Sequence, residues 1–243
     1  MRATERVYLA DDQCLSTTAT VMAVGERALA LDRTCFHPGG AGQPCDAGTL
    51  RLPDGLTLPI VAVRDDDAGV LWHCTETQPS ENLLGARVQL ALDGERRALI
   101  ARHHTVLHVL NTIVLRDHGG WITGAQIQPD YSRIDFNLQR ISPELCAALE
   151  RQVNAVIAGD RPIHVCRLPA AEFARRTDLL RTLEVRPPMI DGCVRVVAIE
   201  GFDAQACGGT HVPRTSAVGR IRIVRTENKG RQNKRLYVAL DPP

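Results

Sequence analysis

Two short motifs, far apart in the chain, carry side chains that can bind a metal ion. In His104-Thr105-Val106-Leu107-His108, the two imidazoles are four residues apart and share one face of a helix. In Cys207-Gly208-Gly209-Thr210-His211, a thiol and an imidazole have the same spacing, with two glycines that suit a tight loop. Each motif alone also fits ordinary helix histidines or a surface turn. Together they supply three nitrogens and one sulfur, a set that favours Zn²⁺.

The first motif differs from the zinc-protease pattern, which needs glutamate directly after the first histidine. Thr105 stands there. The remaining cysteines lack the spacing of metal ligands and are expected to be small core or surface residues. Because the first residues lack an apolar secretion signal and no apolar run is long enough to span a membrane, we expect a cytoplasmic protein with free thiols.

Charge divides the chain unevenly. The 243 residues carry a net charge of +1, with 44% hydrophobic and 23% charged residues, as in globular proteins. Residues 1–90 have a balance of −5, whereas residues 91–243 have a balance of +6. This asymmetry indicates two units, of which only the second is suited to a polyanionic partner.

The first third of the chain is rich in short, β-branched apolar runs. We expect strands at residues 18–24, 27–32, 58–63, 70–74 and 88–92. The stretch from Phe36 to Pro44 contains too much glycine and proline for a strand or helix. Several short strands without helical patterns predict a small N-terminal β-barrel with a glycine-rich motif, over residues 1–92.

Helical spacing begins near Asp93, a suitable N-cap for a helix that ends at Gly119. Ser142 and Pro143 open a second helix as cap and first residue. Further strands are expected at residues 122–128, 132–138, 163–168, 194–199, 219–225 and 236–240. The chain is therefore predicted to be α+β, with a mixed α/β domain over residues 93–243.

The pairing of the two metal-binding motifs resembles the editing domain of alanyl-tRNA synthetase and its free-standing relatives, the AlaX-type trans-editing proteins. Other segments match in the same order. They are the glycine-rich stretch of residues 32–48, similar to FYPxGGGQPxDxG, then Arg97, Gly124-Ala125-Gln126-Ile127, Arg133-Ile134-Asp135-Phe136, Glu150, Asn154, Val194-Arg195-Val196-Val197 and residues 203–211. His37 replaces the usual tyrosine, and Ala41 replaces a motif glycine. If the backbone at this position needs a positive φ, the alanine would be strained.

The resemblance covers about residues 5–240 and implies a longer-form AlaX-type protein. Such a protein would hydrolyse the ester of mischarged alanine tRNA, removing serine or glycine. No stretch resembles a class II aminoacylation core, so the resemblance implies action in trans. It also implies a zinc-binding editing domain whose metal ligands are His104, His108, Cys207 and His211.

The resemblance also suggests roles for other residues. Gln126 and the ligand Cys207 are the predicted catalytic residues. Substrate binding is predicted for Thr34, whose hydroxyl would recognise serine, and for Gly40, Gly42 and Gln43, which would shape a loop over the pocket. A strand-edge glutamine and an ordinary strand threonine are the plain alternatives. The Gly-Gly-Ala-Gly run fits no nucleotide-binding pattern, so no nucleotide cofactor is expected.

A basic segment near the C-terminus is the predicted tRNA contact. Between residues 214 and 235, eight lysines and arginines face one acid, Glu227. A solvated hairpin would also explain this composition, but the resemblance favours RNA. The predicted RNA-binding residues are Arg222, Lys229, Arg231 and Arg235.

Two other functions remain open at this level. One is an editing hydrolase for another misacylated tRNA, such as serine-charged threonine tRNA, because threonyl-tRNA synthetase carries a related domain. The other is a non-catalytic, zinc-stabilised RNA-binding module. The sequence leaves the serine-to-glycine preference, the role of zinc and the oligomeric state undetermined.

Overall fold

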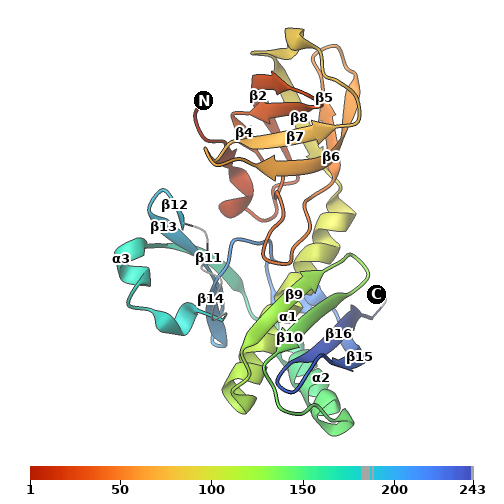
Figure 1. The fold of residues 1–243 in the computed structure, drawn as a ribbon, viewed down its shortest axis with the longest axis vertical. Helices are drawn as coiled ribbons and strands as arrows, with labels where there is room; N and C mark the ends of the chain where they lie inside the picture. The colour runs from red at the N-terminus through yellow and green to blue at the C-terminus, as the bar shows by residue number, and fades with distance from the viewer. Residues whose placement is uncertain (182–186, 188, 242–243) are drawn as a thin grey trace. The chain divides into compact units, whose positions relative to one another are not determined.

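A computed structural model describes residues 1–181, 187 and 189–241. The chain forms two compact units, and Figure 1 shows their elements. The first comprises Met1–Gly40 and Pro44–Ala98, and the second comprises Ala41–Gln43 and Leu99–Pro243. Three residues of the glycine-rich motif therefore pack with the second unit.

The first unit is a closed barrel of six strands in the order β2-β3-β7-β6-β5-β8. The strands are β2 (Ser16–Gly25), β3 (Ala28–Leu31), β5 (Gly48–Arg51), β6 (Thr57–Asp65), β7 (Leu71–Thr75) and β8 (Arg87–Leu92). The predicted β2–β3 and β6–β7 hairpins are confirmed. Strand β5 was not predicted from the sequence; it pairs with β6 and β8 and closes the barrel.

Smaller elements complete this unit. They are a parallel pair of short strands, β1 (Glu5–Arg6) and β4 (Arg33–Thr34), and the 3₁₀ turns η1 (Val7–Leu9) and η2 (Glu81–Leu83). From Phe36 to Pro44 the chain forms no helix and no strand longer than a single bridging residue, as predicted.

A buried ion pair between Arg97 and Asp46 connects the two ends of the glycine-rich stretch. Arg97 Nη2 lies 2.5 Å from Asp46 Oδ2, and these side chains are 3% and 1% exposed. Arg97 also donates to the carbonyl of Cys35, and Asp46 Oδ2 accepts from the backbone N–H of His37. Both ends of the stretch are thus tied to one carboxylate. Breaking such a buried pair costs several kcal/mol, about 3–5, because it leaves one charge uncompensated.

The second unit has two long helices and two sheets. The helices are α1 (Gly94–His118), most of which belongs to this unit, and α2 (Pro143–Ala158). One sheet has the order β15-β16-β10-β9, from β15 (Ile221–Asn228), β16 (Lys234–Leu240), β10 (Ser132–Phe136) and β9 (Ile122–Ile127). The other pairs β13 (Cys193–Ile199) with β11 (Ile163–Pro169), β12 (Met189–Ile190) and β14 (Asp203–Ala206).

The shorter elements of the second unit are α3 (Ala170–Phe173), η3 (Thr177–Leu179) and η4 (Thr215–Val218). Helix boundaries agree with the predicted caps. Asp93 Oδ1 accepts from the N–H of Arg96, and Ser142 Oγ accepts from the N–H of Leu145. No helix in the described ranges combines the length and apolarity that crossing a bilayer requires.

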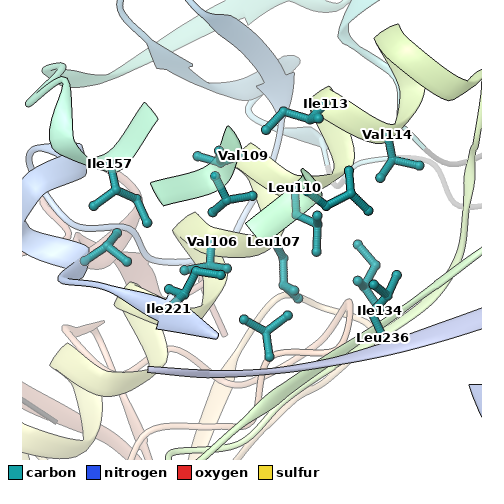
Figure 2. Packing of buried hydrophobic residues seen from close by; sticks show 14 of the residues in the cluster. Val106, Leu107, Val109, Leu110, Ile113, Val114, Ile134, Ile157, Ile221 and Leu236 are labelled. Atoms are coloured by element: carbon teal, nitrogen blue, oxygen red, sulfur yellow. The ribbon is translucent and has the colours of Figure 1, made fainter. Parts of the chain in front are cut away.

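Helix α1 runs through the core of the second unit. Figure 2 shows Val106, Leu110 and Ile113 of this helix among apolar side chains from α2 and from the β15–β9 sheet. All three are at most 1% exposed. Fully burying such a side chain contributes about 1.5–3 kcal/mol. The helix is buried on most sides, so polar side chains that it carries must find partners inside the protein.

Candidate metal centre

The structure brings together the four predicted ligands. His104 and His108 lie on α1, and Cys207 and His211 lie in the loop that follows β14. One ligand atom from each of these residues lies within 4.8 Å of the others. The histidines are 8%, 7% and 1% exposed in chain order. The four residues therefore form a cluster that can hold a metal ion.

Cys207 lies between two of the imidazoles. Its Sγ is 3.5 Å from His104 Nε2 and 3.5 Å from His211 Nε2. The ring centroids of His104 and His211 are 4.4 Å apart, and those of His108 and His211 are 4.3 Å apart. The backbone N–H of Gly209 lies 3.4 Å from the same sulfur, a position in which it stabilises negative charge there.

Burial keeps His108 in the state that a metal ligand requires. Burial, together with the neighbouring imidazole of His104 and the positive charges of Arg181 and Arg195, lowers the pKa of His108 well below its ordinary value. The ring is therefore neutral near pH 7, and only a neutral imidazole binds a metal.

Gln43 contacts both halves of the cluster. Its Oε1 lies 2.8 Å from His104 Nδ1 and accepts from the backbone N–H of Thr210 at 3.1 Å. Its Nε2 donates to Thr210 Oγ1 at 3.1 Å. The side chain is 4% exposed. Gln43 was predicted to lie in a substrate loop, whereas these three hydrogen bonds go to residues of the two metal-binding motifs.

Two residues that contact the cluster, Thr105 and Arg195, were not predicted from the sequence to do so. Thr105 Oγ1 lies 3.1 Å from His211 Nδ1 and donates to the carbonyl of Ala101 at 2.9 Å. Arg195 Nη1 donates to the carbonyls of Cys207 and Gly209, at 3.0 and 2.7 Å. Arg195 was noted only as part of a family match, and the position of Thr105 between two ligands was the only signal for its role.

Gln126 lies on β9, where its Oε1 accepts from Arg133 Nε at 2.8 Å. The two residues are cross-strand partners on β9 and β10. No polar contact between Gln126 and the four clustered residues is recorded for the described chain. Its catalytic role stays a prediction.

Thr34 lies inside the first unit. It is 0% exposed, and its Oγ1 lies 2.8 Å from His73 Nε2 and accepts from the N–H of Phe36. A hydroxyl has one hydrogen and two lone pairs. These contacts occupy most of that capacity, so the environment argues against the predicted contact with a serine substrate.

The glycine-rich motif needs left-handed backbone at successive positions. Gly40 and Gly42 have φ of 119° and 87°. A Cβ on Gly42 would lie 2.5 Å from the carbonyl oxygen of Ala125, while the N–H of Ile127 donates to the carbonyl of Gly42 at 2.7 Å. Ala41 has φ of 49°, the strained conformation considered above, which costs an L-residue about 1–2 kcal/mol.

Several of the predicted RNA-binding residues have acidic partners. Arg235 forms two hydrogen bonds of 2.7 Å with Asp135, which holds the pKa of its guanidinium above the usual value. Arg222 pairs with Asp241 at 2.5 Å, and Lys229 pairs with Glu227 at 2.7 Å. Asp135 and Asp241 lie outside the basic segment, so counting charge within the segment overestimated its excess.

Arg231 differs from these residues. It is exposed and forms no ion pair or side-chain hydrogen bond recorded in the described part of the chain. Among the four predicted RNA-binding residues, it offers the charge least compensated by the protein.

The sequence of this chain is similar to those of known proteins. Residues 194–237 match the family described as "Threonyl and Alanyl tRNA synthetase second additional domain". The chain is 33% identical to the alanyl-tRNA editing protein AlaX-M of Methanosarcina barkeri, over 98% of this chain and 99% of that protein. It is 30% identical to AlaX-M of Saccharolobus solfataricus, over 98% of this chain and all of that protein.

A larger protein shows the same similarity over part of its length. The alanine–tRNA ligase of Thermofilum pendens is 37% identical over 92% of this chain, which corresponds to 24% of the ligase. Similarity to the AlaX-M proteins, by contrast, extends over nearly the full length of both partners. The chain therefore belongs to the family of free-standing, AlaX-type alanyl-tRNA editing proteins.

Proposed function

We propose that this protein is a trans-editing hydrolase that deacylates mischarged alanine tRNA, with serine as the main amino acid removed and glycine as a second. Residues 93–243 are the editing domain in this proposal, and residues 1–92 are a barrel that carries the glycine-rich motif. The observation that carries the proposal is the cluster of three buried histidines, His104, His108 and His211, with the half-buried Cys207, in a chain of this family.

The donor set supports zinc as the metal. At tetrahedral geometry, a Zn–S bond of about 2.3 Å and a Zn–N bond of about 2.0–2.1 Å place sulfur and nitrogen roughly 3.6 Å apart. Both separations between Cys207 Sγ and a histidine Nε2 are 3.5 Å. Three imidazoles and a thiolate also suit zinc better than Mg²⁺ or Ca²⁺, which prefer oxygen ligands.

The reaction is hydrolysis of the ester between the amino acid and the 3′ ribose. A synthetase that selects alanine discriminates weakly against one added hydroxyl or one lost methyl, so a second hydrolytic site is needed. A bound zinc ion would supply a Lewis acid that polarises the carbonyl, lowers the pKa of a water molecule or orients the amino group. The protein's own residues must hold that ion and the ester in a fixed relation.

In this proposal Cys207 acts as a metal ligand, and Gln126 holds the substrate or the attacking water. Gly40 and Gly42 shape the substrate loop. Their left-handed φ values allow close backbone approach, which supports such a role. Thr34 is predicted to recognise the serine side chain, and its buried contacts offer a structural role as the alternative.

The RNA partner is tRNA, contacted through phosphates by the basic segment. Of Arg222, Lys229, Arg231 and Arg235, the first two are 58% and 42% exposed despite their ion pairs, and Arg235 is 17% exposed. We therefore assign the main phosphate contacts to Arg231, Lys229 and Arg222, and assign Arg235 mainly to the fold.

A deacylation panel tests the function. The substrates are alanine tRNA charged with serine, glycine or alanine, and threonine tRNA charged with serine. We expect fast release of serine from alanine tRNA, slower release of glycine, and little release of alanine. Preference for serine-charged threonine tRNA would instead identify the related editing activity suggested by the threonyl part of the family description. Binding of all four without hydrolysis would identify a non-catalytic module.

A further inference from the structure

We propose that Gln43 and Thr105 are positioning residues of the metal centre. Each accepts a hydrogen bond from the Nδ1–H of one histidine ligand and thereby directs the Nε2 atom of that ring toward the metal. The inference rests on the metal site proposed above. In it, the glutamine of the glycine-rich motif orients a metal ligand and does not contact the substrate.

The orientation of the Gln43 amide follows from its partners. The backbone N–H of Thr210 can only donate, so the Gln43 atom that faces it at 3.1 Å must be the oxygen, Oε1. Oε1 can only accept, so His104 Nδ1, 2.8 Å away, must carry the proton. A neutral imidazole protonated on Nδ1 has its lone pair on Nε2, the atom that lies 3.5 Å from Cys207 Sγ.

Thr105 leads to the same conclusion for the second ring. Its hydroxyl hydrogen is directed to the carbonyl of Ala101 at 2.9 Å, so the oxygen acts as an acceptor toward its other partners. Those partners are His211 Nδ1 at 3.1 Å and the N–H of Val212 at 3.3 Å. His211 therefore also carries its proton on Nδ1 and presents the lone pair of Nε2 toward Cys207, 3.5 Å away.

Glycines make room for the Gln43 amide. A Cβ on Gly209 would lie 2.1 Å from His104 Cε1 and 2.5 Å from Gln43 Oε1. A Cβ on Gly42 would collide with the backbone of β9 at Ala125. Gly209 thus leaves the space in which Gln43 meets His104, and Gly42 lets the chain just before Gln43 pack closely against β9. Gln43 of the glycine-rich motif therefore contacts Thr210 of the CGGTH motif directly.

The two roles for Gln43 predict different measurements. A substrate-binding residue changes KM and leaves zinc affinity unchanged. A residue that orients a ligand changes zinc affinity, because outer-sphere partners of metal-binding histidines typically contribute 10–100-fold. All three recorded hydrogen bonds of the Gln43 side chain go to His104 and Thr210, which favours the second role.

The first test measures the zinc dissociation constant of the full chain by competition with a chromophoric chelator. Gln43→Leu and Thr105→Val should each weaken zinc binding by about 10–100-fold. Gln43→Glu and Thr105→Ser keep an acceptor for the Nδ1 proton and should remain within about threefold of the wild type. Thr112→Val is the matched control. Thr112 donates to the carbonyl of His108 as Thr105 does to Ala101, but its hydroxyl has no recorded contact with a ligand ring.

The second test locates the protons directly. Long-range ¹⁵N–¹H correlation spectra of the wild-type protein should show His104 and His211 protonated on Nδ1. Wild-type zinc affinity in both Gln43→Leu and Thr105→Val, or protonation of either ring on Nε2 instead, would overturn the inference. A wild-type chain that binds no zinc would overturn both the metal site and this inference. A chain that binds zinc as predicted but hydrolyses no ester would contradict only the proposed function.

Discussion

Each unit buries a threonine hydroxyl against an imidazole, but the two pairs use different ring nitrogens. In the barrel, Thr34 Oγ1 lies 2.8 Å from His73 Nε2, while His73 Nδ1 faces the carbonyl of Leu29 at 3.4 Å. In the second unit, Thr105 Oγ1 lies 3.1 Å from His211 Nδ1, and His211 Nε2 faces the sulfur of Cys207. The first ring bonds within an ordinary core, whereas the second points a nitrogen at another metal-binding group.

The difference shows how to separate a structural histidine from a ligand. His73 packs edge-on against Phe36, and burial lowers its pKa to about 4. Its recorded polar partners are the Thr34 hydroxyl and backbone groups of Leu29 and Leu71, none of which is a zinc ligand. Burial and a threonine partner are therefore insufficient signs of function. The group that faces the second nitrogen distinguishes the two cases.

The largest expected effect comes from Cys207→Ala. It removes the only thiol of the cluster, so zinc binding and deacylation of serine-charged alanine tRNA should fall on the order of 100-fold or more. The fold should persist, because the second unit has a large apolar core of its own. Single-turnover deacylation and circular dichroism measure the two quantities. Cys166→Ala, which removes an exposed thiol, is the control. Equal rates for both variants would contradict the site.

The next effect concerns pH and His73. Its pKa is about 4 in the folded protein, against 6.5 for an ordinary histidine, so the unfolded chain binds more protons between these values. Stability should therefore fall as pH decreases through this window, by about 2–3 kcal/mol between pH 7.5 and 4.5 from this group. Urea unfolding, followed by Trp72 fluorescence in a Trp121→Phe background, measures the barrel. His73→Gln should reduce this slope. A slope unchanged by that substitution would show that the pKa of His73 is not lowered in the folded protein.

Thr34→Val should destabilise the barrel by about 1–3 kcal/mol, because the N–H of Phe36 and a ring nitrogen of His73 lose a buried partner. Thr34→Ser should restore most of the loss. The ratio of serine to glycine deacylation should stay near that of the wild type. If the ratio changes while the free energy of unfolding does not, Thr34 contacts the substrate as the sequence suggested.

The smallest effect separates paired from unpaired cations. Arg231→Gln should raise KM and reduce the logarithmic salt dependence of KM by roughly 0.7–0.9, the value for one phosphate contact. The kcat should remain near wild type, because phosphate contacts bind ground and transition states alike. Arg235→Gln should mainly lower stability, since it breaks a two-bond pair with Asp135. A salt slope that responds only to Arg235→Gln would reverse this assignment.

Most elements could be predicted because their sequence patterns are local. The hairpin turn before Ala28, the Asp93 cap and the Ser142-Pro143 start all appear in the structure. Strand β5 was missed because Gly48–Arg51 is short and follows the glycine-rich stretch directly. Its pairing depends on contacts distant in sequence, since a Cβ on Gly48 would lie 2.2 Å from the carbonyl oxygen of Ala91.

The candidate site shows the same limit. The four ligands were found because their spacing and family resemblance are visible in the sequence. The contacts of Gln43 and Thr105 were not, because they depend on which atoms meet after folding. The acidic partners of Arg222 and Arg235 could not be predicted for a related reason, since Asp241 and Asp135 come from outside the basic segment.

Zinc content and deacylation, measured on the same preparations, test the central claim most directly. Purified protein is titrated from the metal-free to the zinc-loaded form, and release of serine from alanine tRNA is measured at each step. We predict about one zinc per chain at saturation and an activity that rises in proportion to bound zinc. Folded protein that deacylates at the full rate without zinc would contradict the claim that His104, His108, Cys207 and His211 form the metal centre of the hydrolase.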